Sequence, residues 1–171
     1  MAAMVTDWRT ALVEGSGNGV RMAWDRLSPW PGGKRLFSVI IGRTAPYSGS
    51  IGAQVVELER GHSKVRLDDR HEVRNHLRSI HAIAFVNLAE IAGNVCLAYS
   101  MPDDARFIVA GLSIDYLKKA RGQVTAECRM PPIATSARAE YAVPVELTDE
   151  AGALVARCTL RTLVGPKKGV G

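Results

Sequence analysis

One stretch decides the fold: residues 80–99 read IHAIAFVNLAEIAGNVCLAY. Its apolar residues recur on nearly every side of a helix, as in a helix that is buried all round. The stretch is long enough to cross a bilayer, but His81, Asn87, Glu90 and Asn94 interrupt it, and a carboxylate at mid-bilayer is expensive. We therefore predict the central core helix of a globular domain and no membrane insertion.

Alternating apolar and polar residues flank this helix on both sides, as in half-buried strands. Two strands are predicted before it, over residues 51–56 and 63–68. Four more are predicted after it, over 107–117, 123–129, 138–147 and 154–162, with a hairpin turn at 149–152. An antiparallel sheet with one apolar face can wrap an apolar helix, so the fold class is α+β.

The first fifty residues are interrupted by glycine and proline and show only short helical patterns, at 6–14, 20–27 and 34–42. We interpret residues 1–50 as a helical extension that packs on the main domain at 51–164, with Trp8, Trp24 and Trp30 supplying contacts. Residues 165–171 are predicted to form a flexible tail.

Composition limits the possible functions. The 171 residues include 22 basic and 17 acidic ones, giving a net charge of +5 that is spread along the chain. A nucleic-acid-binding protein would show a denser basic face, so an anionic small molecule is the better partner. The three cysteines have no metal-ligand spacing, and the N-terminus has no secretory pattern. We predict a reduced, cytoplasmic protein with no metal site and no separate cofactor.

Polar residues on the helix suggest a functional face. At 100° per residue, Asn87, Glu90 and Asn94 share a stripe about 60° wide. Such a stripe faces a subunit interface, a water-filled cleft or a ligand. Ser79 is the predicted N-cap, which would leave the amides of residues 80–82 free to polarise a carbonyl.

The residues at this point resemble a known family. Asn75, then His81, then Leu88-Ala89-Glu90 is similar to the signature of hotdog-fold thioesterases of the phenylacetate-pathway (PaaI-like) type. Those proteins read N-x-x-G-x-x-H-G-G, followed by L-A-D or L-A-E on the central helix. The segment 117–122 also resembles the family's F-L-R-P-A-R-x-G. The resemblance covers about residues 51–164 and implies a hotdog fold, a sheet curled around one long helix.

The resemblance implies a hydrolase of fatty-acyl or aryl-acyl coenzyme A, a homodimer or dimer of dimers with the acyl site between subunits. Glu90 would be the general base or nucleophile, Asn75 would position the thioester or water, and amides near His81 and Ala82 would polarise the carbonyl. Further substrate contacts are expected from other polar side chains: His76, Asn87, Lys118, Lys119 and Arg121.

The chain also departs from this pattern. Ala82 and Ile83 replace the two glycines after the histidine, and Arg78 replaces the loop glycine. Because glycine lets a substrate carbonyl approach the backbone, these changes favour a second hypothesis, a non-catalytic protein that binds an acyl ligand. A hotdog dehydratase or hydratase is a third hypothesis, but the glycine- and proline-rich helix entry of that family is missing.

Overall fold

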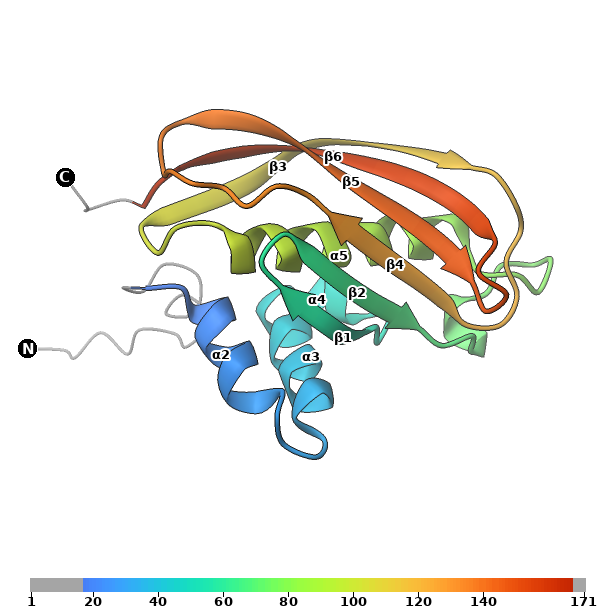
Figure 1. Ribbon diagram of the computed structural model, residues 1–171. Coiled ribbons are helices and arrows are strands. Elements are labelled where there is room, and N and C mark those ends of the chain that lie inside the picture. Colours follow the sequence, from blue (N-terminus) through green and yellow to red (C-terminus); the bar gives the residue numbers. More distant parts are fainter. Residues whose placement is uncertain (1–16, 168–171) are drawn as a thin grey trace, which may run out of the picture.

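The computed structural model describes residues 17–167, and its centre is helix α5 (Ala82–Ser100), around which a six-stranded sheet curls (Figure 1). All neighbouring strands are antiparallel, in the order β1-β2-β4-β5-β6-β3. The strands are β1 (Gln54–Glu59), β2 (His62–Leu67), β3 (Ala105–Tyr116), β4 (Val124–Arg129), β5 (Ala139–Asp149) and β6 (Leu154–Pro166). The predicted α+β hotdog architecture is confirmed.

The inner face of the sheet and α5 form the core. Alternate residues of the central strands are fully buried, for example Val143, Val145 and Leu147 on β5, while their neighbours are exposed. Helix and sheet approach closely at Gly93, where a Cβ would collide with the side chain of Leu160 on β6. By length and hydropathy α5 could cross a membrane, but 67% of it is buried inside the domain, as the sequence predicts for a core helix.

Three helices lie on the side of α5 away from β3, β5 and β6: α2 (Gly19–Leu27), α3 (Gly33–Thr44) and the short α4 (Pro46–Gly49), which the sequence did not predict (Figure 1). The rings of Trp24 and Phe37 meet edge to face at 5.1 Å and join α2 to α3. Trp30, in contrast, is 72% exposed, so its predicted packing role was wrong. The predicted helix at 6–14, with Trp8, lies outside the described residues.

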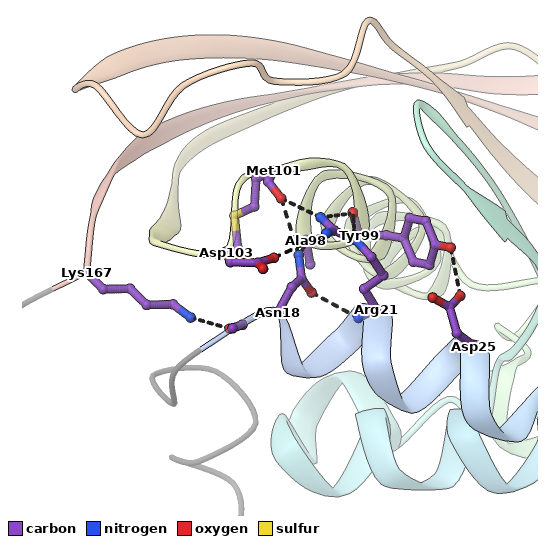
Figure 2. A network of polar contacts seen from close by, with 9 residues as sticks. Asn18, Arg21, Asp25, Ala98, Tyr99, Met101, Asp103 and Lys167 are labelled. Carbon is purple, nitrogen blue, oxygen red and sulfur yellow. Dashed lines mark hydrogen bonds and ion pairs between the residues drawn. The ribbon is translucent and has the colours of Figure 1, made fainter. Parts of the chain in front are cut away.

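Helix α2 caps the C-terminal end of α5 through a polar network (Figure 2). The buried Asn18 side chain donates from Nδ2 to the carbonyl of Ala98 at 2.6 Å, and its Oδ1 accepts the Arg21 amide. The Arg21 guanidinium donates to the carbonyls of Tyr99 and Met101 at 2.9 and 2.7 Å. The last carbonyls of a helix have no partners within it, so α2 satisfies groups that would otherwise be unpaired.

Element boundaries otherwise shift by a few residues. The first strand begins at Gln54, three residues later than predicted, because Gly52 has a positive φ of 59° and belongs to a turn. At the other end β6 runs to Pro166, and Lys167 is buried with its Nζ 2.7 Å from the carbonyl of Gly17. The predicted boundary of the tail at 165 was therefore wrong, and the rest of that tail, 168–171, lies outside the described residues.

The capping network gives a stability prediction. Asn18→Ala removes both the N-cap of α2 and the donor to Ala98, so we expect the free energy of unfolding to fall by about 1–3 kcal/mol. Urea denaturation followed by circular dichroism measures this. Met22→Ala, on the same helix but 60% exposed, is the matched control and should change little. Equal effects of the two substitutions would contradict the capping role.

Candidate active site

The loop before α5 is built around Asn75. Its Oδ1 accepts from the amides of Leu77 and Ser79 at 2.9 and 3.2 Å and from the Ser79 hydroxyl at 3.2 Å. Arg78, at the position of the family's loop glycine, has a φ of 55°, which is uncommon for a residue with a side chain. The side-chain oxygen of Asn75 is therefore occupied by hydrogen bonds that hold this tight loop.

The helix itself begins later than predicted. His81, not Ser79, is the N-cap: its Nδ1 accepts from the amide of Ile83 at 3.1 Å, and α5 begins at Ala82. The expected N-cap failed because the Ser79 hydroxyl is bound to Asn75. The His81 amide donates to the carbonyl of Val73 at 2.8 Å.

One backbone donor remains at this helix end. Because the His81 and Ile83 amides are occupied, neither can polarise a substrate. The amide of Ala82, an exposed residue, makes no hydrogen bond with any other described residue. It lies at the positive end of the helix dipole, where a developing negative charge is stabilised.

The β3–β4 loop packs against this helix entry. The amide of Ile80 donates to the carbonyl of Ala120 at 3.0 Å, and Arg121 reaches the carbonyl of Leu77 at 3.4 Å. Lys118 instead forms an ion pair with Asp149 at 2.9 Å. The exposed side chains of Lys119 and His76 make no hydrogen bond or ion pair with other residues in 17–167.

Tyr116, at the end of β3, was missed as a site residue. Its hydroxyl donates to the carbonyl of Ala82 at 3.1 Å, and its ring stacks on Phe85 at 6.3 Å. Burial, followed by the nearby Cys158 thiol, raises the pKa of Tyr116, so it remains a neutral donor. No sequence pattern indicated this contact, because only the fold shows that β3 ends beside the helix entry.

Glu90 is half-buried on α5 and forms no hydrogen bond or ion pair with the described residues. Burial, and then the negative charge of Glu90, raises the pKa of the Cys158 thiol on β6 to about 11. Glu90 lines none of the three surface cavities that we identified on the single chain.

The predicted polar stripe is divided. Asn87 is 3% exposed and donates from Nδ2 to the carbonyl of Tyr47 on α4 at 3.2 Å, while its Oδ1 is buried without a partner. Asn94 Oδ1 is also buried and unpartnered. Asn87 therefore packs against the N-terminal helices, about 60° round α5 from Glu90.

Glu90 and the Ala82 amide are separated along the helix. Glu90 follows Ala82 by eight residues, which is about 12 Å of helix rise. The Glu90 carboxylate and this amide therefore do not lie side by side in a single chain.

An uncovered surface lies beside Glu90. Strand β3 is an edge of the sheet, and Tyr116 at its end is 47% exposed. On the neighbouring face of α5, Ile83 is 49% exposed, and Val86 and Asn94 are partly exposed. Edge strands and apolar faces of this kind pair readily with a second chain.

Comparison with known proteins identifies the family. Residues 33–164 match the model of the family described as Domain of unknown function (DUF4442). The chain belongs to this family. The matched region includes α3 and α4, which we had predicted to belong to an N-terminal extension. Helix α2 lies before the matched region. No curated protein is significantly similar to the chain.

Solved structures share the fold. The chain is 34% identical to a protein solved as a genomics target, covering 86% of this chain and 97% of that one with a TM-score of 0.74. A Pseudomonas aeruginosa protein of unknown function, described as a "Probable Thioesterase", is 23% identical, with coverages of 80% and 97% and a TM-score of 0.70. A Haemophilus influenzae thioesterase is 14% identical, with coverages of 72% and 85% and a TM-score of 0.64. These likenesses establish the hotdog fold found among thioesterases.

Asp69 anchors the loop that carries Asn75, and this makes stability depend on pH. The hydrogen bond from Arg74, at 2.6 Å, holds the pKa of Asp69 below its ordinary value; burial opposes this shift, and the hydrogen bond from the Gly122 amide supports it. A carboxyl with a lowered pKa stabilises the fold above its unfolded pKa of about 3.9, and this contribution is lost as the pH falls through the folded value.

We therefore expect wild type to exceed Asp69→Asn in unfolding free energy at pH 7, with the difference shrinking as the pH falls below about 4. Urea denaturation of both proteins at several pH values measures it. Asp115→Asn, which changes an exposed carboxylate on β3, should show no such trend. A difference that is constant with pH would contradict the ionic role of Asp69.

Proposed function

We propose that this protein is an acyl-coenzyme A thioesterase that hydrolyses a fatty-acyl or aryl-acyl thioester at a site shared by two chains. The observation that carries the proposal is the pair of uncommitted groups on α5, the Glu90 carboxylate and the Ala82 amide. Neither group forms a hydrogen bond or an ion pair with another residue in 17–167. The thioesterase descriptions of several structural neighbours point to the same chemistry.

A homodimer, or a dimer of such dimers, would complete the site. Pairing of two β3 edges would extend the sheet and bring the exposed faces of two α5 helices together. Glu90 of one chain would then approach the Ala82 amide of the other, whereas the two groups of one chain are about 12 Å apart along the helix axis.

The reaction follows from these positions. Glu90 would accept a proton from a water molecule as the water oxygen bonds to the thioester carbon, and the Ala82 amide would stabilise the oxyanion. Collapse of this intermediate breaks the carbon–sulfur bond, and the thiolate of coenzyme A takes the proton from Glu90. With Glu90 as nucleophile, its carboxylate oxygen would first bond to the same carbon, and breaking of the carbon–sulfur bond would release the thiolate of coenzyme A and leave an anhydride. Water would then hydrolyse this anhydride to the free acid and regenerate Glu90.

Other residues would support this chemistry. Asn75 holds the loop before the helix, and Tyr116 fixes the first turn through the Ala82 carbonyl. Arg121 and Lys119 lie on the loop that packs beside this entry and would meet the phosphates of coenzyme A. Lys118 contributes less, because Asp149 already offsets its charge. The three free, buried cysteines suit a reduced compartment such as the cytoplasm.

A non-catalytic acyl-ligand-binding protein is the second candidate. The observation in its favour is Ile83, whose side chain is 49% exposed beside the Ala82 amide. The PaaI-like thioesterases that the chain resembles have glycine at this position. A bulky side chain there restricts how closely a thioester carbonyl can approach.

Glu90→Gln separates these candidates. We expect wild type to hydrolyse at least one member of a series of acyl-coenzyme A esters, and the variant to lose about 100-fold or more in kcat, as for loss of a general base. Release of the free thiol measures the rate. Glu72→Gln, at an exposed site outside α5, is the matched control and should keep full activity.

Two outcomes would contradict the hydrolase. One is equal hydrolysis by wild type and Glu90→Gln. The other is thermal stabilisation of wild type by acyl-coenzyme A without turnover of any chain length, which would establish the binding protein instead.

A further inference from the structure

A large cleft lies between the N-terminal helices and the β1–β2 hairpin, away from Glu90. Its volume is about 910 Å³, within the range of about 300–1,000 Å³ that ligand sites occupy. Its walls come from α3, α4, β1 and β2, and Ile91 of α5 lies among its lining residues. Ile91 is 100° round the helix from Glu90, so the cleft and the candidate active site occupy different sides of α5.

The inner part of this cleft is apolar. Val55 and Ile91 are 1% and 8% exposed, and the half-buried Ile41 and Ala53 complete this surface. Gly42 and Gly49 approach so closely that a Cβ on either would meet the other's backbone, which keeps α3 and α4 together along one wall. An apolar chain entering here would exchange water for hydrocarbon contacts.

The rim of the cleft is basic. Three arginines line it, Arg35, Arg43 and Arg66, against a single acidic residue, Asp68. The exposed side chains of Arg35 and Arg43 make no hydrogen bond or ion pair with other residues in 17–167. Two guanidinium groups without carboxylate partners are therefore available to an anion at the rim.

Arg66, the third arginine of the cleft, already has partners. Its Nη2 donates to Gln54 at 3.3 Å, but its Nε is buried and has no hydrogen-bond partner among the described residues. Asp68 Oδ1 lies 3.4 Å from that Nε, as an ion-pair contact without hydrogen-bond geometry. Arg66 is therefore held by Gln54 and Asp68, and the anion-binding role in this cleft falls to Arg35 and Arg43.

We propose that this cleft binds a long-chain fatty carboxylate, with its hydrocarbon chain on Ile41 and Ala53, which lie above the buried Val55 and Ile91, and its carboxylate at Arg35 and Arg43. The apolar residues of the cleft favour a hydrocarbon chain, and the arginines at its rim favour an anionic head group. Inorganic phosphate or the nucleotide of coenzyme A would use the arginines alone and leave the apolar surface uncovered. This second site does not depend on hydrolysis at Glu90.

Isothermal titration calorimetry with free carboxylates tests the proposal. We expect saturable binding of dodecanoate, with each added methylene from hexanoate upwards strengthening it by about two- to fourfold. Inorganic phosphate and coenzyme A serve as head-group probes and should compete weakly. No saturable binding of dodecanoate, or affinity that is independent of chain length, would overturn the proposal.

Variants locate the binding site. The double variant Arg35→Gln/Arg43→Gln should weaken dodecanoate binding by tenfold or more, and Ala53→Leu, which fills the apolar part without changing charge, should weaken it too. Arg60→Gln, an exposed arginine outside the cleft, is the matched control. Glu90→Gln should bind dodecanoate as wild type does, even where it abolishes hydrolysis.

These variants also distinguish the two proposals. Dodecanoate binding that survives both cleft changes in folded protein, or that is lost only in Glu90→Gln, would assign the ligand to the Glu90 site and overturn the cleft site. The thermal midpoint of each variant confirms that it is folded. Loss of hydrolysis in Glu90→Gln, in contrast, says nothing against the cleft.

Discussion

The rest of the structure depends on the need to cover a helix that is apolar on nearly all sides. The sheet covers one side of α5, and α2, α3 and α4 cover a second (Figure 1). A strip beside the β3 edge stays uncovered in the single chain, and it carries Glu90 and the exposed Ile83. Burying a charged group costs free energy unless it is paired, so the acid lies on this partly exposed strip rather than in the core.

The two ends of α5 differ in how far their terminal backbone groups are hydrogen-bonded. At the C-terminal end Asn18 and Arg21 satisfy the last carbonyls, which fixes the helix in the domain (Figure 2). At the N-terminal end His81 caps one amide, and the Ala82 amide is left without an acceptor. The hydrogen-bonded C-terminal end stabilises the fold. The N-terminal end carries the positive end of the helix dipole and one amide without an acceptor among residues 17–167.

The architecture was largely predictable, because alternation and an apolar run are local signals. Six strands and α5 followed from these patterns. The details of the site were not predictable, because they depend on which long-range partner each side chain finds. Ser79 did not cap the helix because Asn75 binds it, and Asn87 faces protein because the Tyr47 carbonyl of α4, a helix that the sequence did not predict, accepts from its side chain. Lys167 left the predicted tail because it reaches Gly17 at the start of the described chain.

The central claim is that Glu90 and the Ala82 amide act together only across two chains, and subunit mixing tests it most directly. Ala82→Pro removes that amide at the first helical position, where proline is tolerated, and the extended His81 (φ −68°, ψ 139°) suits a following proline. Glu90→Gln and Ala82→Pro should each be nearly inactive alone. Co-refolded in equal amounts, they should recover about a quarter of wild-type hydrolysis, since half of the dimers would be mixed and each would hold one intact site. No recovery on mixing would contradict a shared site.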